Sequence, residues 1–473
     1  MLQPVNRLPP EILSQVARHV PNWSDHNAGP IVPLTHVCRY WRESIVSTPE
    51  NWTLISSSCE HVAALSLERA KAAPLVIWLS MESVMRNPRI PDIITPYFQN
   101  VATLAVPSIP TFGEFTKRFP SFPRSMPNLR SLTLGVDNKE EWDLSIDPFE
   151  SLSHNLRCLE LIKIPLYPSF LPLKTLTRLT LIDWRFSLNL DTLLNFLEGN
   201  VSLESVKLWI RFVKPSLRNS RRRAAIGNRL LYLSITFRDV MDARALITNI
   251  PLRKGAHLDI FSIGGTRLKE ILFGISTTHF PNLPSPTFMQ YRPSMESVRL
   301  HRMKSVQLHG PNGTFSFRRH NSTAEPFADF IEFPLIALTS VRELRIIDFG
   351  RVGFPLPSLP ALETLTIQTY AGVLDVLSDL LSNPSSSPSL KTLAFLNCHL
   401  SEDFMEELTR FASNRKNIST SAWLHRVLIV HWDGRFPSTG SIQRLRSYVT
   451  IVDVRMGDSE VPEDSEIERY LTG

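Results

Sequence analysis

The residues of this sequence that could do chemistry are few, and the densest group of them is basic. Seven cations gather within one stretch: Arg211, Lys214, Arg218, Arg221, Arg222, Arg223 and Arg229. Arginine clusters bind carboxylates and phosphates through paired hydrogen bonds, so this stretch could hold an acidic protein, a phosphate group or a nucleic acid. A solvated loop is the alternative. No aromatic residue interrupts Arg218–Arg229, whereas single-stranded nucleic acids bind where aromatic side chains alternate with cations.

Catalytic and metal-binding patterns are not apparent elsewhere. The sequence has no glycine-rich phosphate loop and no Gly-x-Ser-x-Gly nucleophile turn. His301 and His309 have no acidic or cysteine partner at metal-ligand spacing, and Glu402, Glu406 and Glu407 fit the solvated face of one helix. We therefore expect no enzymatic activity, no cofactor and no metal.

The cysteines and the apolar runs bear on the compartment. Four cysteines are scattered singly along the 473 residues: Cys38, Cys59, Cys158 and Cys398. None belongs to a Cys-x-x-Cys motif, and so few in a long chain do not form a disulfide framework. The N-terminus lacks the pattern of a signal peptide, and no apolar run reaches the roughly 20 residues that span a bilayer. We expect an intracellular, reducing location, cytoplasmic or nuclear, without membrane contact.

The overall charge balance is mild. The 51 lysine and arginine residues exceed the 45 aspartate and glutamate residues by 6, and the C-terminal end is acidic. Nucleic-acid-binding proteins carry a dense basic face, so this balance by itself does not indicate such a partner.

The elements that must position these residues follow an internal repeat. An apolar triplet recurs in which two residues separate the first and second members and one residue separates the second and third. Its copies are Val101, Leu104, Val106; Leu129, Leu132, Leu134; Leu156, Leu159, Leu161; Leu176, Leu179, Leu181; Leu203, Val206, Leu208; Leu230, Leu233, Ile235; Met295, Val298, Leu300; Val341, Leu344, Ile346; Leu362, Leu365, Ile367; Leu390, Leu393, Phe395; and Leu424, Val427, Ile429. Leu258, Ile260 and Ile263 could form a degenerate copy.

The spacing of the triplets predicts one short strand in each unit. Several copies start 27 or 28 residues apart, and the longer intervals imply missed units or insertions. The last two apolar residues of each triplet would face the core, and the residue between them would face outward. Apolar residues at helical spacing predict helices near residues 190–197, 374–381 and 404–411, the last of them starting at Ser401.

This pattern resembles the leucine-rich-repeat family over about residues 95–455. The resemblance implies an α/β fold, a solenoid in which parallel strands form one surface and helices or turns return the chain. The family pattern continues with Asn or Cys three residues after the third apolar position. Only Cys398, followed by Leu400, fills that place here, so the turn ladder of a regular horseshoe is mostly missing.

The first residues form a different kind of segment. Residues 8–13 (Leu-Pro-Pro-Glu-Ile-Leu) predict a helix start, because proline fits the first turn and Glu11 suits the positive end of the helix dipole. Pro21 should end that helix, and a second helix should span Leu34–Val46. A further helix near 62–73 and a strand near 75–79 would join this segment to the repeats.

Residues 8–13 and 37–42 (Val-Cys-Arg-Tyr-Trp-Arg), followed by Pro49 and Trp52, resemble an F-box. The middle, residues 22–33, departs from that pattern. The resemblance implies docking on the Skp adaptor and through it on a cullin, within an SCF-type ubiquitin ligase. It implies that the following residues form the contact or its support: Leu8, Pro9, Ile12, Leu13, Val37, Cys38 and Trp41.

Together these patterns predict a substrate receptor with four parts. A helical module covers residues 1–60, a linker helix and first strand 61–94, an irregular repeat array 95–455, and an acidic tail 456–473. A ligase subunit of this type needs no catalytic site, because it supplies proximity. A repeat scaffold without a ligase role, with the helices as a cap on the first repeat, is the alternative.

The unknown target protein would bind the outward row of the strands. That row would include Glu160, Thr180, Lys207, Ser234, Arg299, Arg345 and Thr366. The basic candidates for target binding are Lys207, Arg221, Arg222, Arg223, Arg299 and Arg345. Their charge predicts an acidic or phosphorylated protein rather than a nucleic acid.

Overall fold

A computed structural model describes most of the chain, and its contacts divide the chain into two units, residues 1–230 and 231–473. The division falls within the predicted repeat array. The described residues are 8–19, 31–122, 125–136, 155–164, 173–184, 188–210, 213–214, 229–237, 239–250, 252–253, 255–262, 288–294, 303–310, 313–320, 340–348, 359–369, 373–383, 386–396, 401–418, 423–431 and 437–456.

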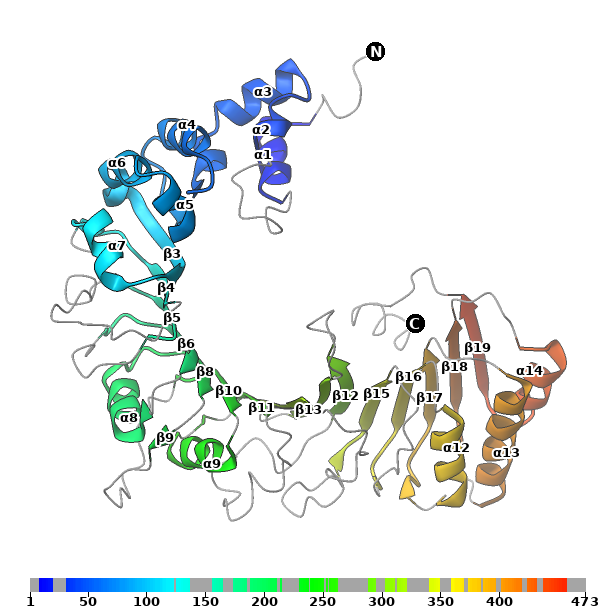
Figure 1. Ribbon diagram of the computed structural model, residues 1–473. Coiled ribbons are helices and arrows are strands. Elements are labelled where there is room, and N and C mark those ends of the chain that lie inside the picture. The colour runs from blue at the N-terminus through cyan, green and yellow to red at the C-terminus, as the bar shows by residue number, and fades with distance from the viewer. Residues whose placement is uncertain are drawn as a thin grey trace. The chain divides into compact units, whose positions relative to one another are not determined.

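The first unit begins with a small helical module, drawn in dark blue in Figure 1. It consists of α1 (Pro10–His19), α2 (Ile31–Leu34), α3 (Arg39–Val46) and the 3-10 helix η2 (Pro49–Trp52). The predicted second helix over Leu34–Val46 is wrong in its extent, because residues 35–38 form a turn that separates α2 from α3.

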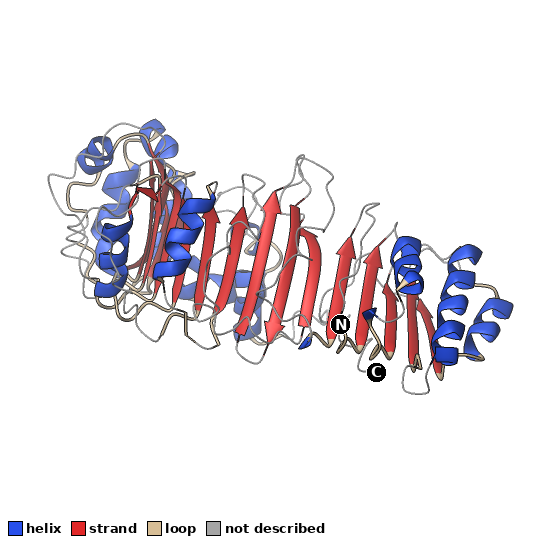
Figure 2. Ribbon diagram, turned by 90° about the horizontal axis from the view of Figure 1, so that it is seen from below, coloured by secondary structure: helices blue, strands red, loops and turns tan. Residues whose placement is uncertain are grey.

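A parallel sheet follows the module in the same unit (Figures 1 and 2). Its strands, in spatial order, are β1 (Leu54–Ser56), β2 (Leu75–Trp78), β3 (Val101–Ile109), β4 (Ser131–Val136), β5 (Cys158–Ile162), β6 (Arg178–Trp184) and β8 (Ser205–Ile210). Two further short strands, β7 (Leu188–Asn189) and β9 (Val213–Lys214), pair separately. Strand β1 was not predicted from the sequence.

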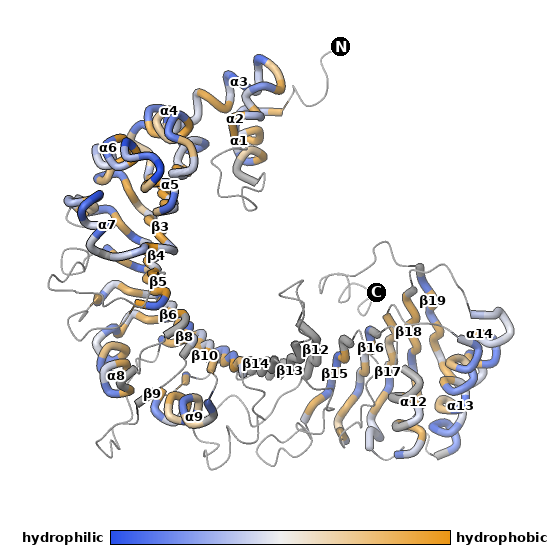
Figure 3. The backbone as a smooth tube through the Cα atoms, in the orientation of Figure 1, coloured by the Kyte–Doolittle hydropathy of each residue, from blue (hydrophilic) through white to orange (hydrophobic). Residues whose placement is uncertain are grey.

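The apolar triplets set the register of this sheet. Leu132 of β4 pairs with Leu159 of β5, and Leu159 pairs with Leu179 of β6, so equivalent positions of successive units lie side by side. Each of these three residues is at most 2% exposed. The prediction that these leucines lie on buried strands is confirmed, and Figure 3 shows the resulting apolar colour along the strands.

The helices of the first unit connect the strands and cover one side of the sheet. They are α4 (Glu60–Ala70), α5 (Met81–Arg86), α6 (Ile90–Ile94), the 3-10 helix η3 (Thr95–Asn100), α7 (Phe112–Arg118) and α8 (Leu190–Gly199). Figure 1 shows α4, α6, α7 and α8 on the same side. The apolar stripe of α8 is buried through Leu193, Leu194 and Leu197, as its spacing predicts.

The second unit also contains a sheet, and most of its strands are parallel. In spatial order the strands are β10 (Tyr232–Phe237), β11 (His257–Ser262), β14 (Gly313–His320), β13 (Met303–Gly310), β12 (Phe288–Ser294), β15 (Glu343–Asp348), β16 (Thr364–Thr369), β17 (Thr392–Leu396), β18 (Arg426–His431) and β19 (Ile451–Met456). Strand β13 runs antiparallel to both neighbours. The sheet of the second unit is therefore mixed, whereas the sequence predicted parallel strands only.

Two sequence expectations concern the long interval after residue 230. Leu258 and Ile260 of the degenerate copy are buried in β11, which pairs in parallel with β10. The copy Met295, Val298 and Leu300 lies outside the described residues. The antiparallel pair β13 and β14 occupies part of the interval, which explains why no regular spacing was found there.

The helices of the second unit are α9 (Val240–Asn249), α12 (Val373–Ser382), α13 (Glu402–Ile418) and α14 (Thr439–Arg446) among the described residues. Figure 1 shows α12, α13 and α14 on one side of β16 to β19. The Phe395 ring of β17 meets Phe404 of α13 edge-on at 5.0 Å. The Ser401 hydroxyl accepts a hydrogen bond from the Phe404 amide, so α13 starts where the sequence predicts.

Strands β17 and β18 are apolar on both faces. While Phe395 faces α13, alternate residues of the two strands point the other way and form a second, fully buried cluster of Ala394, Leu396, Leu428 and Val430. Continuous apolar runs of this kind are typical of parallel strands that are covered on both sides.

Candidate partner-binding surfaces

The helical module carries several apolar side chains that are exposed to solvent. Ile12 is 40% exposed and Val16 is 39% exposed, and both lie on α1 four residues apart, which places them on one helix face. Val37, in the turn before α3, is 57% exposed, and Pro9 is also exposed. Of the residues predicted to contact an adaptor, Pro9, Ile12 and Val37 are the accessible ones.

The other predicted contact residues build the module from inside. Leu13 is fully buried and Trp41 is 8% exposed, so both can only support a contact. Leu8 and Cys38 are half-buried. The Tyr40 hydroxyl donates a 2.6 Å hydrogen bond to the carbonyl oxygen of Leu8, which ties the segment before α1 to α3.

Further hydrogen bonds hold the module together, and a cation–π contact joins it to α4. The Ser14 hydroxyl donates to the side-chain oxygen of Asn51 at 2.7 Å, and the Trp52 indole N–H donates to the Ile45 carbonyl at 3.0 Å. The guanidinium of Arg69 in α4 lies 4.3 Å from the centre of the Trp52 ring. The module is thereby fixed to the helix that follows it.

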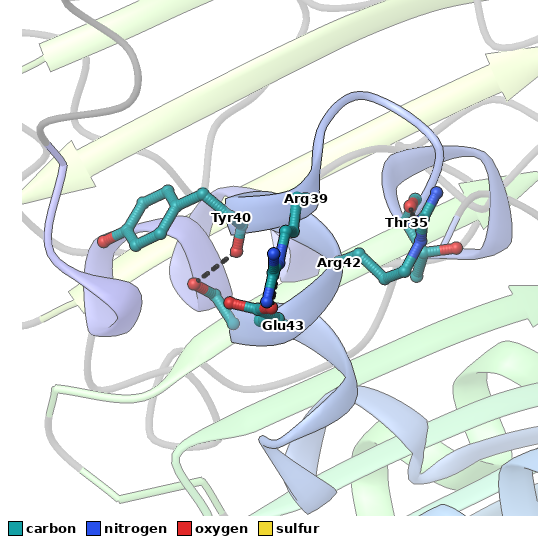
Figure 4. Close-up of polar contacts among 6 residues, drawn as sticks. Thr35, Arg39, Tyr40, Arg42 and Glu43 are labelled. Carbon is teal, nitrogen blue, oxygen red and sulfur yellow. Dashed lines mark hydrogen bonds and ion pairs between the residues drawn. The ribbon is translucent and has the colours of Figure 1, made fainter. Parts of the chain in front are cut away.

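Figure 4 shows the polar contacts along α3. Arg42 donates to the Thr35 carbonyl at 3.0 Å, and Arg39 forms a 2.7 Å ion pair with Glu43 one turn later. The hydrogen bond that Arg39 donates to Glu43 and the negative charge of Glu43 raise the pKa of the Arg39 guanidinium. Because both partners of that pair are exposed, it offers charge to a partner and adds little to stability.

The first unit has a sheet face that is accessible. The outward row of its strands consists of the residues between the two buried apolar residues of each triplet. In this row Thr133, Glu160 and Thr180 are half-buried, and Lys207 is exposed. The Thr133 hydroxyl donates to Glu160 at 3.1 Å across β4 and β5. Trp209, two residues after Lys207 on the same face, is 38% exposed. Lys207 is thus accessible, as expected for a residue that binds a target.

In the second unit the described residues of this outward row are buried. The prediction that they are accessible to a target is therefore wrong. Ser234 and Arg345 are each 8% exposed, and Thr366 is 2% exposed. The Arg345 guanidinium forms a 2.8 Å ion pair with Glu343 two residues earlier on β15. Arg345 is therefore a buried, paired cation rather than a free contact for a target.

The remaining predicted target-binding residues cannot be placed. Arg221, Arg222, Arg223 and Arg299 lie outside the described residues, as do Arg211 and Arg218 of the basic stretch. Arg229 is exposed at the end of the first unit. The acidic tail is likewise outside the described residues beyond Met456.

An asparagine ladder that was not predicted from the sequence links successive units. The side-chain amide of Asn100 donates to the Lys71 carbonyl at 3.3 Å, and Asn155 donates to the Pro127 carbonyl at 2.7 Å. Between them, Asn128 donates to the Gln99 carbonyl at 2.7 Å. Each of these asparagines directly precedes the first apolar residue of a triplet. That repeated position was a readable signal.

Two features are absent from the described part of the chain, a metal-binding cluster and a membrane-spanning helix. There, no three His, Cys, Asp or Glu side chains gather closely enough to hold a metal ion. Within the same residues, no helix combines the length and the apolar character needed to cross a bilayer. Among the described residues, Cys38, Cys59 and Cys158 form no disulfide bond.

Comparisons with known proteins add no family. No protein-family model matches this chain, and no curated protein matches it either.

Proposed function

We propose that this protein is a substrate-receptor adaptor: its N-terminal module binds the Skp adaptor of an SCF-type ubiquitin ligase, and its sheet holds a target protein. The observation that carries the proposal is the exposure of apolar side chains on the module, Ile12 and Val16 on one face of α1 and Val37 in the turn before α3, while Leu13 and Trp41 are buried. Exposed apolar side chains grouped on a small module mark an interaction site.

The resemblance to an F-box indicates that the partner of this surface is the Skp adaptor. The two matching segments, residues 8–13 and 37–42, flank the contact between α1 and α3, which pack against each other. A partner that covers Ile12 and Val37 would remove from water the apolar surface that the chain leaves open.

We further propose that each of the two sheets is built of irregular leucine-rich repeats. In the first unit, the in-register leucines of β4, β5 and β6 and the asparagine ladder support this, because both join equivalent positions of successive repeats. In the second unit, Leu344, Leu365 and Leu393 are likewise in register across β15, β16 and β17. A repeat array offers an extended surface to a protein partner.

The test is direct binding of the purified chain to a purified Skp adaptor. Ile12→Asp combined with Val37→Asp alters only exposed positions, so the fold should be kept. Loss of an interface anchor usually costs on the order of 2–4 kcal/mol, or roughly 30-fold or more in affinity. Met85→Asp is the matched control, because Met85 is also 40% exposed but lies on α5.

The outcomes separate two functions. Binding by the wild type and the Met85 variant, with loss in the double variant, supports the ligase adaptor. If the wild type does not bind the Skp adaptor, the module is only a cap and the chain is a scaffold that holds a partner without a ligase. The accessible face of the first unit supports a partner-holding role in either case.

A further inference from the structure

Three arginines of successive units lie near the start of neighbouring strands: Arg130 and Arg157 precede the paired residues Ser131 and Cys158, whereas Arg178 itself pairs with Cys158, one residue further along. Arg130 directly precedes β4, Arg157 directly precedes β5, and Arg178 is the first residue of β6. The Arg157 amide donates to the Arg130 carbonyl at 2.8 Å, and the Arg178 amide donates to the Arg157 carbonyl at 2.9 Å. We call these three residues the arginine edge.

The arginine edge is exposed, and no acidic side chain among the described residues pairs with it. All three side chains are exposed. None of them forms a side-chain hydrogen bond or an ion pair with any residue that the structure describes. Arg130 and Arg157 hold equivalent positions on strands about 4.8 Å apart, and Arg178 lies one residue further along the next strand, so like charges that repel one another gather at this edge.

The acidic groups near the arginine edge do not neutralise it. Glu160, on β5, accepts the hydrogen bond of Thr133 instead. Glu204 is exposed at the start of β8, one strand beyond Arg178, and Lys174 adds a further exposed cation in the turn before β6. The edge therefore remains cationic over the three strands β4, β5 and β6.

We propose that the arginine edge binds an extended anionic segment of the target protein. The guanidinium fork matches the two oxygens of a carboxylate or a phosphoryl group, so both acidic and phosphorylated residues fit. In an extended peptide, alternate side chains point the same way about 7 Å apart, a spacing that flexible arginines on strands about 4.8 Å apart can reach. This inference deepens the target-holding part of the proposed function and does not depend on adaptor docking.

A peptide fits better than a nucleic acid. Single-stranded nucleic acids bind where bases stack on aromatic side chains. The positions beside the three arginines are Ser131, Cys158 and Thr177, none of which is aromatic. Charge without a stacking surface favours a protein ligand.

The experiment measures binding of labelled peptides to the full chain by fluorescence polarisation. Three peptides share one sequence and differ at two alternate positions, which are phosphoserine, glutamate or serine. The wild type should bind at least one anionic peptide and not the serine peptide. Comparison of the phosphoserine and glutamate peptides shows which anion is preferred, and a thymidine oligonucleotide tests the nucleic-acid alternative.

Substitutions of Arg157 make the test specific. Arg157→Glu should weaken anionic peptide binding by roughly tenfold or more, because it places a like charge at the centre of the edge. It should leave the melting temperature unchanged or raise it, since it puts opposite charges beside Arg130 and Arg178. Arg157→Lys keeps the charge but loses the fork, so it should weaken binding less.

The matched control is Lys117→Glu, an exposed cation on α7 with the same change of charge. It should leave peptide binding within about twofold at physiological salt, where screening lengths are about 8 Å. Equal loss in the Lys117 and Arg157 variants, or tighter binding of the oligonucleotide, would overturn the proposal. So would failure of both anionic peptides to bind. Binding of the Skp adaptor to the Arg157 variant should equal that of the wild type, so the two proposals fail separately.

Discussion

The side-chain amide of Asn128 donates a 2.7 Å hydrogen bond to the carbonyl oxygen of Gln99, a residue 29 positions earlier. The bond satisfies a backbone acceptor in the preceding unit with a side chain from the next. Asn100 and Asn155 repeat the same relationship, so one unit is tied to the next by residue type as well as by strand pairing.

Removal of this amide should loosen the first unit. Asn128→Ala should lower the free energy of unfolding by about 1 kcal/mol, the usual net value of one hydrogen bond. Asn128→Asp should cost more, because it sets a carboxylate against the Gln99 carbonyl. Urea denaturation measures both. Asn195→Ala, on the exposed side of α8, is the control and should cost nothing. Equal losses at Asn195 and Asn128 would contradict the ladder.

Two adjacent residues of β6 test the phase of the strands, that is, which of their side chains face the core and which face outward. Leu181 is 1% exposed, whereas Thr180 is half-buried on the opposite face of β6. Leu181→Ala should lower the free energy of unfolding by about 2–5 kcal/mol, and Thr180→Ala by less than about 0.5 kcal/mol. Similar values for the two variants in urea denaturation would show that the phase is wrong.

A second pair of variants tests a close approach of two strands. A Cβ atom added to Gly135 of β4 would lie 2.0 Å from the carbonyl oxygen of Pro107 in β3. Gly135→Ala should therefore destabilise the chain by about 1–3 kcal/mol, since the backbone must move. Gly113 on α7 has open space around it. Gly113→Ala should stabilise the chain by about 0.5–1 kcal/mol, because alanine favours a helix. Thermal unfolding should show shifts of opposite sign.

The two buried tryptophans of the helical module should differ in their need for an indole N–H. Trp52 donates to the Ile45 carbonyl, whereas the buried Trp41 indole nitrogen has no hydrogen-bond partner among the residues that the structure describes. Trp52→Phe should cost about 1–3 kcal/mol through the carbonyl that it leaves unpaired, in addition to lost packing. Trp41→Phe loses packing only, so the melting temperature should fall less. A larger fall for Trp41→Phe would contradict the hydrogen-bond assignment.

The contact between α13 and α14 should depend on pH. The Ser441 hydroxyl donates a 2.7 Å hydrogen bond to Glu402, and hydrogen bonds from Ser441 and Ser438 lower the pKa of that carboxyl. A lowered folded-state pKa means that the stabilisation is present above the ordinary pKa of glutamate and is lost as the pH falls through the folded value. NMR titration of Glu402 should show a higher pKa in Ser441→Ala than in the wild type. An unchanged titration would show that the bond does not form in solution.

The sequence predicted the elements whose signals are local. The apolar triplets predicted β3, β4, β5, β6, β8, β10, β15, β16, β17 and β18 with the correct buried residues, because alternation and burial are properties of a few neighbouring residues. Helical spacing likewise predicted α8, α12 and α13. Within the F-box-like segment, the sequence alone does not distinguish the exposed Ile12 from the buried Leu13. Only their packing shows which residue can contact a partner and which supports the contact.

What the sequence did not predict depends on distant partners. The break between α2 and α3, the short strand β1 and the antiparallel strand β13 follow from tertiary pairing rather than from propensity. Arg345 looks like a surface cation in an alternating strand, yet it is buried beside Glu343. The arginine edge was overlooked because Arg130, Arg157 and Arg178 lie 27 and 21 residues apart, and only strand pairing makes them neighbours.

The three-residue strand β1 has a consequence for self-association. Within the first unit it is the terminal strand, in register with β2 from Leu54 to Ser56, and the chain reaches it directly from the helical module. A long unprotected strand at the border of a sheet would recruit strands from other molecules. Because its sheet ends on a short strand attached to helices, the protein blocks end-to-end growth of chains into fibres at this border. A fragment that starts after β1 would present the free amides and carbonyls of β2 and should assemble into larger species as its concentration rises.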